Sequence, residues 1–400
     1  MLACGVLVAG GGIGGLSVAV AAARTNRRVS LYEKAPAFGE VGAGLQLGPN
    51  ATRILCGWGL RQQLLRVAAL PEALVVRNAR SGCELGRLPL GRSMEQRYGA
   101  PYATVHRVDL HALLHAAAGQ TGGVNLLLDA EVHGYAEDAS SVSLDTSLGR
   151  SGPAALLIGA DGLHGAVRRQ LLDDGPAWFV GEVSYRSMLD TSGLPATARG
   201  NQVTAWLGPG LHVVQYPVRQ GAAMNLVVLL NARGQVAGAG SSPDADAAAV
   251  TQALSGACPA LRELVASVPA ASINARPWTQ WPLMARRPLR SAAQMAQGRV
   301  ALLGDTAHPM RPYLAQGAGM AIEDAAVLAR MLDAEPGAAA ALQRYAQARW
   351  QRCARVQRRS ARNGRIFHAS GARRWGRDAA LRLLGPRLMD VPWLYGHAIS

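Results

Sequence analysis

The hydrophobic pattern of the first part of the chain predicts alternating strand and helix. Residues 6–9 are continuously apolar and predict a buried strand, residues 14–24 are rich in alanine and predict a helix, and residues 29–33 predict a second strand. This order of elements is the opening of a βαβ unit, in which a helix joins two parallel strands. We therefore expect a parallel sheet covered by helices.

Two later apolar runs predict further buried strands, and each ends in an acidic residue. Residues 154–161 end at Asp161, and residues 299–305 end at Asp305. The carboxyl ends of parallel strands form the edge at which open α/β sheets bind ligands. Both carboxylates are therefore expected beside a bound molecule.

The middle of the chain follows a different pattern. Residues 180–230 alternate apolar and polar positions between Gly and Pro turns, which predicts a mostly antiparallel sheet inserted into the first domain. Helices are expected at 110–118, around 249–267, and throughout the chain after residue 318, except at "RRWG" and the final "PWLYG". The fold class is therefore α/β, with a Rossmann-like domain, an inserted β-sheet domain and C-terminal helices.

A glycine motif lies between the first strand and the first helix. Gly10, Gly12 and Gly15 have the spacing GxGxxG, and Glu33 ends the next strand. Small residues let the backbone approach a pyrophosphate, whose charge is stabilised by free N–H groups and the helix dipole. Glu33 can accept hydrogen bonds from a ribose. This arrangement predicts a dinucleotide site.

The identity of the dinucleotide depends on the rest of the chain. No second GxGxxG is present, so either the site holds NAD in a simple dehydrogenase, or it holds FAD and the nicotinamide has no Rossmann domain of its own. Asp305 favours FAD, because an acid at a strand end can receive the ribityl hydroxyls. Free N–H groups at 317–319 would stabilise the reduced flavin, which is anionic. Pro309 and Pro312 would stiffen the intervening loop.

Charge and cysteine content narrow the remaining classes. The formal charge is +15, and arginines are concentrated in residues 344–387. We interpret them as a solvated helical face that attracts small anions rather than as a nucleic-acid interface. The cysteines are scattered, and neither they nor the histidines show metal-ligand spacing, so we expect reduced thiols and no metal site. The glycines in the longest apolar run argue against a membrane span, and we expect a cytoplasmic protein.

Three segments in the same order resemble the motifs of a known family, the class A flavoprotein aromatic hydroxylases with the p-hydroxybenzoate hydroxylase fold. They are "GGGIGGL", "IGADGLHGAVR" and "LLGDTAHPMRPYLAQGAGMAIEDA". Four further segments resemble 3-hydroxybenzoate 6-hydroxylases, with salicylate and 6-hydroxynicotinate hydroxylases as near relatives. They are "PYATVHRVDLHALL", "GPGLHVVQYPVRQGAAMNLVV", "GRIFHASG" and "PWLYG".

The resemblance implies which residues hold FAD, bound tightly and without a covalent link. They are the phosphate-loop residues Gly10, Gly12, Ile13, Gly14 and Gly15, then Glu33 and Lys34 near the adenosine, Leu45, Gln46 and Arg107 along the cofactor, Val132 beside the adenine, Asp161 in the second motif, and Asp305, Pro312, Gly317, Ala318 and Gly319 around the ribityl chain and flavin. NADH or NADPH would bind only in passing.

The resemblance also implies a substrate pocket on the central sheet. His212 and Tyr216 share one face of the strand "HVVQYPV" by the period of two. Electrophilic oxygen attacks an electron-rich ring, and neutral imidazole can remove the phenolic proton that makes it so. We therefore expect His212 to act as base, and Tyr216 and Tyr102 to orient the substrate. His308 is expected to have a structural or flavin-side role.

These inferences give three expected regions. They are an FAD-binding domain at 1–70, 106–178 and 282–340, a β-sheet substrate domain at 71–105 and 179–281, and a helical segment at 341–400. The leading hypothesis is an FAD-dependent monooxygenase that uses NAD(P)H and O2 to hydroxylate a small aromatic acid, with 3-hydroxybenzoate favoured over salicylate and 6-hydroxynicotinate. A simple NAD-dependent dehydrogenase, a flavin oxidase and a non-catalytic flavin- or nucleic-acid-binding protein are the alternatives. The resemblance suggests a homodimer.

Overall fold

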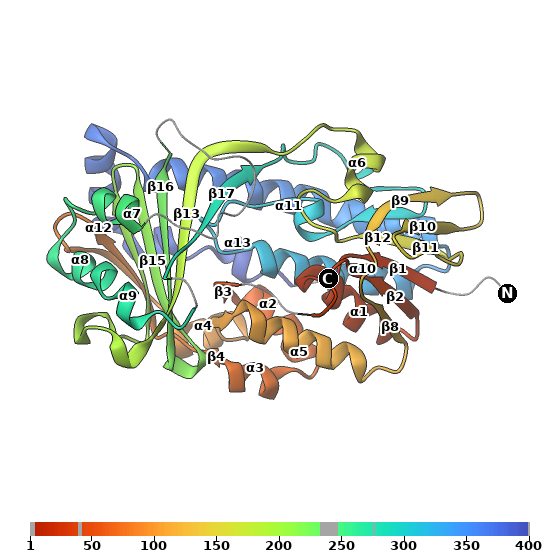
Figure 1. Ribbon diagram of the computed structural model, residues 1–400, viewed down its shortest axis with the longest axis horizontal. Helices are drawn as coiled ribbons and strands as arrows, with labels where there is room; N and C mark the ends of the chain where they lie inside the picture. The colour runs from red at the N-terminus through yellow and green to blue at the C-terminus, as the bar shows by residue number, and fades with distance from the viewer. Residues whose placement is uncertain (1–4, 39–41, 233–246, 275–276, 399–400) are drawn as a thin grey trace.

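The computed structural model describes residues 5–38, 42–232, 247–274 and 277–398, and it contains two large sheets that face one another across the molecule (Figure 1). The first has six strands and includes the predicted βαβ unit. Its order is β18 (Ala296–Gln297), β19 (Val300–Leu302), β12 (Leu156–Gly159), β1 (Gly5–Ala9), β2 (Arg28–Tyr32) and β8 (Val124–Leu127). All neighbours are parallel except β18 and β19.

Helices of small residues cover this parallel sheet. Helix α1 (Ile13–Ala23) packs against α5 (Arg107–Gly119) and α10 (Gly317–Ala334), and α10 in turn packs against α11 (Ala338–Phe367). Most of α1 is buried, as its apolar, alanine-rich sequence requires. Apolar strands and close-packed helices thus form one continuous core around the start of the chain.

Smaller elements complete this half of the molecule. They are the sheet of β9 (Val132–Glu137), β10 (Val142–Thr146) and β11 (Gly149–Arg150), the sheet of β3 (Gly44–Leu47), β7 (Ala103–His106) and β4 (Ala68–Ala69), and the helices α2 (Pro49–Gly57), α3 (Arg61–Val67), α4 (Gly91–Tyr98) and α6 (Ala166–Leu172). The short 3-10 turns are η1 (Thr191–Gly193), η2 (Ala196–Ala198), η3 (Arg219–Gly221), η4 (Ala292–Gln294) and η5 (Gly304–Thr306).

The second large sheet is the predicted inserted sheet. Its order is β17 (Thr279–Ala285), β13 (Trp178–Asp190), β16 (Ala223–Asn231), β15 (Leu211–Val218), β14 (Gln202–Gly208), β5 (Ala73–Asn78) and β6 (Glu84–Pro89). Only β14 and β5 are parallel. A separate hydrophobic core covers one face of this sheet. It contains side chains of the strands and of the segment from α7 (Ala247–Ala253) to α9 (Val268–Ala271). The opposite face of the sheet is therefore available for a site.

Two helical expectations were wrong. The single helix expected around 249–267 is two helices, α7 and α8 (Pro259–Ala266), because Pro259 cannot continue a helix and instead begins a new one. "RRWG", expected outside helix, lies within α12 (Gly371–Met389), and "PWLY" forms α13 (Pro392–Tyr395). Helix α12 packs on β6, and this tertiary contact outweighs the low helix propensity of its glycines.

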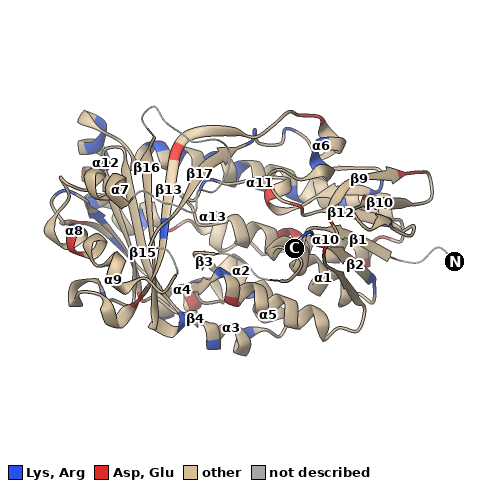
Figure 2. Cartoon of the chain, in the orientation of Figure 1, with Lys and Arg blue, Asp and Glu red and all other residues tan. Residues whose placement is uncertain are grey.

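The described helices and charges bear on two other expectations. None of the helices within the described ranges is long and apolar enough to cross a membrane. Lys and Arg positions are spread from the α12 end of the molecule to the α6 end and do not form a single stripe (Figure 2). Cys56, Cys83, Cys258 and Cys353 are free thiols, and Cys4 lies outside the described residues.

Candidate functional site

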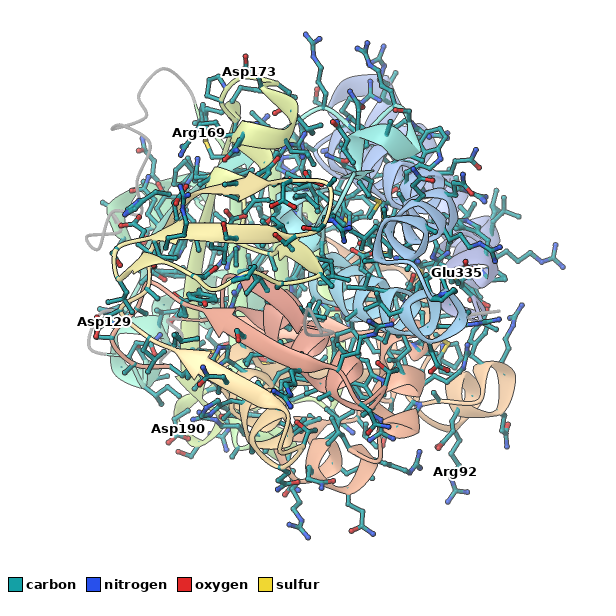
Figure 3. All side chains as sticks on the ribbon, turned by 90° about the vertical axis from the view of Figure 1, so that its right-hand side faces the viewer. Arg92, Asp129, Arg169, Asp173, Asp190 and Glu335 are labelled. Atoms are coloured by element: carbon teal, nitrogen blue, oxygen red, sulfur yellow. The ribbon has the colours of Figure 1, made fainter. Side chains whose placement is uncertain are left out.

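A cavity of about 580 Å³ lies between the two large sheets. Its wall combines the β1–α1 turn, the end of β2, strand β3, the loop before α6, the inner face of the seven-stranded sheet, and residues 303–321. A cavity of this size, lined by residues that are far apart in the sequence, is typical of a cofactor and small-molecule site. Figure 3 views the molecule from the parallel-sheet end and labels Arg169 of α6, which also lines the cavity.

The glycines of the first motif have no room for a side chain. Gly10 has φ +98°, and a Cβ atom there would overlap the carbonyl oxygen of Ala160. A Cβ atom on Gly15 would overlap the carbonyl oxygen of Gly10. Gly12 caps α1 without a side-chain hydrogen bond, so the helix presents bare N–H groups to the cavity. This geometry suits a pyrophosphate.

Glu33 is held in place by backbone donors. The N–H of Gly11 donates to Glu33 Oε2 at 2.6 Å, and the N–H of Ala35 donates to Glu33 Oε1 at 3.0 Å. The carboxylate still lines the cavity and keeps lone pairs for further donors. Its position at the end of β2, beside the glycine turn, fits a ribose contact.

The two predicted strand-end acids both line the cavity but have different surroundings. Asp161 is engaged by the protein: its Oδ2 accepts from the N–H of Val167 at 3.0 Å, and its Oδ1 accepts from Thr306 Oγ1 at 3.3 Å. Burial raises the pKa of Asp161. Asp305 lies in η5 with an exposed side chain and is available to hydroxyl groups of a ligand.

The start of α10 opens into the same cavity. Gln316 caps the helix without a side-chain hydrogen bond to it, and Gly317 and Ala318 line the cavity. A Cβ atom on Gly317 would lie 4.0 Å from Asp305 Oδ1, so the helix start and this carboxylate are adjacent. Bare N–H groups next to a hydroxyl-binding acid are the arrangement that the sequence predicts for the flavin end of FAD.

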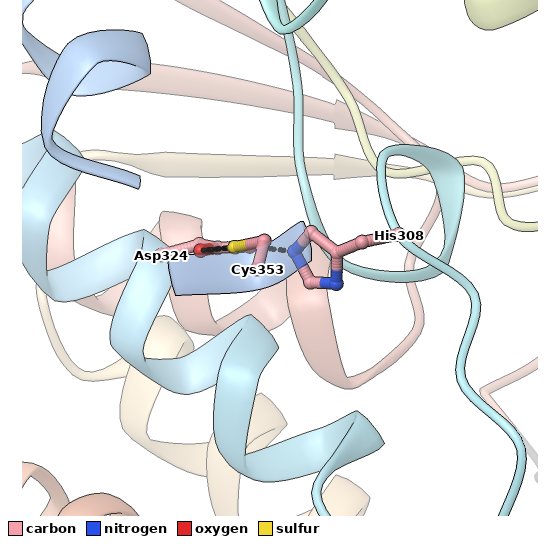
Figure 4. Close-up of side chains that lie close together, drawn as sticks. All are labelled: His308, Asp324 and Cys353. Atoms are coloured by element: carbon pink, nitrogen blue, oxygen red, sulfur yellow. Dashed lines mark hydrogen bonds and ion pairs between the residues drawn. The ribbon is translucent and has the colours of Figure 1, made fainter. Parts of the chain in front are cut away.

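A buried ion-pair network lies on α10 behind this helix start, and Figure 4 shows its members His308 and Asp324 beside Cys353. Asp324 of α10 is fully buried and accepts from His308 Nε2 at 2.6 Å, from Arg349 Nε at 2.7 Å and from the N–H of Gly304 at 3.1 Å. Although burial opposes ionisation, His308 and Arg349 lower the pKa of Asp324 to about 2. Burial also opposes the charged form of His308, but its negative surroundings, including Asp324, raise the pKa of this imidazole well above its usual value.

The same network bears on the expectation that the chain has no metal site. Ligand atoms of His308, Asp324 and Cys353 lie within 4.8 Å of one another, which is close enough to share an ion. However, Asp324 already accepts hydrogen bonds on both oxygens, one of them from the Arg349 cation. A guanidinium at this distance repels a divalent ion, so we interpret the cluster as an ion-pair network that holds α10 in place.

The neighbouring acid extends the network to a second helix. Glu323 accepts from Arg349 Nη1 and Arg352 Nε, each at 2.7 Å, and from Asn50 Nδ2 at 2.7 Å. These bonds tie α10 to α11 and α2 in the interior. Removing one partner of such a buried set leaves a charge uncompensated.

The side of the cavity that the seven-stranded sheet forms is largely apolar. Val214, Val227 and Leu229 of the seven-stranded sheet line it together with Arg186 and Tyr216. Burial raises the pKa of Tyr216, so its hydroxyl stays protonated and can donate a hydrogen bond. A ring that enters here meets aliphatic walls with a few polar groups.

Tyr102 and His212 are not among the residues that line the cavity, although each contacts or neighbours one that does. Tyr102 is buried, and its hydroxyl donates to Gln46 Oε1 at 2.7 Å. His212 is 2% exposed, and its ring centroid lies 5.1 Å from that of Phe367 and 5.7 Å from that of Tyr313. Burial lowers the pKa of His212 to about 3, and its Nδ1 has no hydrogen-bond partner among the described residues.

The structure thus brings most of the sequence-predicted residues to one cavity. All the cofactor-binding candidates line it except Gly15 and Gly319, which are buried beneath it, and of the three catalytic candidates only Tyr216 does so. Sequence reasoning missed Arg186 and Asn225, whose Oδ1 accepts from the N–H of Gly44 at 2.6 Å. The alternation within each strand shows which residues share a face, but the strand order was needed to show which face meets the cavity.

Comparison with known proteins gives the family. Residues 3–360 match the family model described as "FAD binding domain". The chain belongs to this family.

Individual relatives agree with this assignment. A 3-hydroxybenzoate 6-hydroxylase from Polaromonas naphthalenivorans (strain CJ2) is 37% identical over 399 residues, covering 98% of this chain and 95% of that protein. A 3-amino-4-hydroxybenzoate 2-monooxygenase from Streptomyces platensis is 37% identical over 404 residues, covering 98% and 95%. Klebsiella pneumoniae HpxO, solved with FAD and uric acid, has a TM-score of 0.84 at 26% identity, covering 96% of this chain and 94% of that one.

These matches confirm the resemblance seen in the three motifs and decide between the cofactors. The protein is an FAD-dependent aromatic monooxygenase with the α/β fold expected from the sequence. The alternative hypothesis, a simple dehydrogenase that binds NAD at the glycine motif, is therefore wrong. The glycine turn, Glu33, Asp305 and the bare start of α10 fit FAD because they offer small residues, hydroxyl acceptors and N–H donors in that order.

We predict that Gly15→Ala abolishes FAD retention. The added methyl group would overlap the Gly10 carbonyl oxygen and displace the turn that faces the pyrophosphate. Gly57→Ala is the matched control, because a Cβ atom at that exposed helix position has no neighbour within 4 Å. The flavin absorbance per purified chain measures the difference, and a Gly15→Ala protein as yellow as the Gly57→Ala protein would contradict the assignment.

Proposed function

We propose that this monooxygenase converts 3-hydroxybenzoate to gentisate with NADH or NADPH and O2. One oxygen atom enters the ring carbon para to the hydroxyl group, the other leaves as water, and the nicotinamide loses a hydride. The proposal is supported by the 37% identity to a 3-hydroxybenzoate 6-hydroxylase along 98% of the chain. It is also supported by a cavity whose lining continues from the dinucleotide cradle to an apolar wall of Val214, Val227 and Leu229.

Bound FAD would supply the transfer of electrons from the nicotinamide to oxygen. The first motif, Glu33 and Asp305 would hold it, and the N–H groups of Gly317 and Ala318 would stabilise negative charge on the flavin. Val214 and Val227 line the cavity with aliphatic side chains, against which the reacting ring would pack. The protein's contribution is therefore to bind and orient the cofactor and the ring.

The proton of the phenol needs a base, and we assign that role to His212. This residue lies in register opposite Leu229, which lines the cavity. Burial lowers the pKa of His212 to about 3, so the imidazole is neutral at pH 7 but is a weak base in the protein without substrate. Its Nδ1, which has no hydrogen-bond partner among the described residues, is the atom that would take the proton. The Tyr216 hydroxyl lies on the same strand face and would orient the ring by donating a hydrogen bond.

Related acids are the second candidates. The 3-amino-4-hydroxybenzoate 2-monooxygenase is as similar as the 3-hydroxybenzoate enzyme, and both names specify a hydroxylated benzoate. Salicylate and 6-hydroxynicotinate were left open by the sequence, because their hydroxylases are near relatives in the resemblance. All four molecules share a ring hydroxyl group and a carboxylate.

A substrate panel tests the proposed function. The FAD-loaded protein is assayed for NADH and NADPH oxidation with 3-hydroxybenzoate, salicylate, 6-hydroxynicotinate, 3-amino-4-hydroxybenzoate and 4-hydroxybenzoate, and the products are identified. We expect 3-hydroxybenzoate to accelerate oxidation most and to yield gentisate. Acceleration by another acid with its hydroxylated product would replace the substrate, and oxidation that ignores every aromatic would indicate a flavin oxidase.

His212→Gln should separate cofactor binding from hydroxylation. The variant should keep FAD, because His212 lies on β15 and not in the glycine turn, at Glu33 or at the start of α10, but loss of the base should lower the gentisate formed per NADH oxidised at least about tenfold. His115→Gln is the control. His115 lies on α5, not on the seven-stranded sheet, and its ring centroid is 4.6 Å from that of Phe38. A His212→Gln enzyme with the coupling ratio of the control would remove His212 from the mechanism.

A further inference from the structure

We propose that Arg186 binds the carboxylate of the aromatic substrate and makes the enzyme selective for acids over neutral phenols. This assignment rests on the proposed function, because it requires an anionic aromatic ligand. It adds the carboxylate partner, which neither the motifs nor the comparisons identify.

Arg186 lies on β13, the second strand of the seven-stranded sheet, on the face that lines the cavity. In register, Arg186 of β13 is opposite Val227 of β16, which is opposite Val214 of β15, and all three line the cavity. Tyr216 lies two residues beyond Val214 on the same face. The guanidinium therefore belongs to the same apolar chamber as the hydroxyl that would orient the ring.

The protein itself gives this guanidinium little compensation. Its Nε donates to Ser184 Oγ at 3.2 Å, and its central carbon lies 6.0 Å from the centroid of the Trp281 ring. None of the ion pairs formed among the described residues includes Arg186. The side chain is half-buried and lines the cavity, and burial of the guanidinium lowers its pKa.

Other buried arginines of this chain show that the situation of Arg186 is unusual. Arg168 pairs with Asp174, Arg349 pairs with Glu323 and Asp324, and Arg377 pairs with Asp378. Buried charges are normally paired because an isolated cation in a low-dielectric site is costly. When an arginine lines a cavity and has no acid beside it, an anion that binds in the cavity can neutralise its positive charge.

The other cations of the cavity have different surroundings. Lys34 and Arg169 line it with the dinucleotide cradle, whereas Arg107 is close enough to Arg186 for its like charge to contribute to the lowered pKa of Arg186. Arg311 lies nearer the sheet, but its Nη1 is 3.7 Å from Glu182 Oε1. Arg186 is thus the cation of the apolar end whose charge no described acid offsets.

The chemistry of a guanidinium fits a benzoate. Its planar N–H groups match the two oxygens of a carboxylate, and such a pair is strong when water is excluded. The aliphatic side chains of Val214 and Val227 would then contact the ring while its carboxylate faces Arg186. A neutral phenol would leave this cation uncompensated and should bind more weakly.

Ligand binding to the FAD-loaded protein tests the assignment without turnover. 3-Hydroxybenzoate and its neutral analogue 3-hydroxybenzamide are titrated separately, and Kd is read from the change in flavin absorbance. We expect the unsubstituted protein to bind the acid at least about tenfold more tightly than the amide. Arg186→Gln should weaken acid binding about 30-fold or more and change amide binding less than about threefold.

Two further variants control for charge and for structure. Arg186→Lys keeps the positive charge but loses the planar pair of N–H donors. It should therefore bind the acid with an affinity between those of the unsubstituted and Arg186→Gln proteins. Arg311→Gln removes a cavity cation that faces Glu182, and its ratio of acid to amide affinity should stay within about threefold of the original.

Different outcomes separate this inference from the proposed function. Equal affinity for acid and amide in the unsubstituted protein overturns the assignment even if no variant folds. Equal loss of both ligands in Arg186→Gln also overturns it and leaves the substrate proposal intact. An unsubstituted protein that binds no hydroxybenzoate overturns the proposed function and this assignment with it.

Discussion

One buried carboxylate ties the flavin end of the site to the rest of the molecule. Asp324 accepts from Arg349 of α11, from His308 in the loop that precedes α10, and from the N–H of Gly304 at the end of β19. A single side chain thereby joins the parallel sheet, the loop and two helices. Because it lies on α10, it also fixes where the bare N–H groups of that helix point.

The consequence is a site made of two helix starts that face one cavity. Helix α1 begins at the glycine turn, and α10 begins beside Asp305, each without a side-chain cap. Capping groups would have satisfied the same N–H donors, so their absence leaves the donors for a dinucleotide. The inner face of the seven-stranded sheet closes the remaining side with aliphatic residues and one cation without an acid partner among the described residues.

Much of this could be predicted from the sequence because it depends on local patterns. The glycine motif, the strand-end acids Asp161 and Asp305, and the alternation in residues 180–230 each follow from spacing within a few residues. The position of His212 beside Leu229 could not be predicted, because it depends on the register of β15 against β16. The Asp324 network was also missed, since its partners are 16 and 25 residues away and meet only in the folded core. The break before Pro259 was foreseeable, because proline favours the first turn of a new helix.

The central claim is that the buried Asp324 network holds the start of α10 against FAD, and Asp324→Asn tests it most directly. The amide cannot compensate His308 and Arg349, so we predict a loss of about 3–5 kcal/mol in the free energy of unfolding and at least about tenfold weaker FAD binding. Asp333→Asn, on the exposed side of the same helix, should change neither quantity. If the two variants unfold at the same denaturant concentration and retain equal FAD, the network does not position the flavin site.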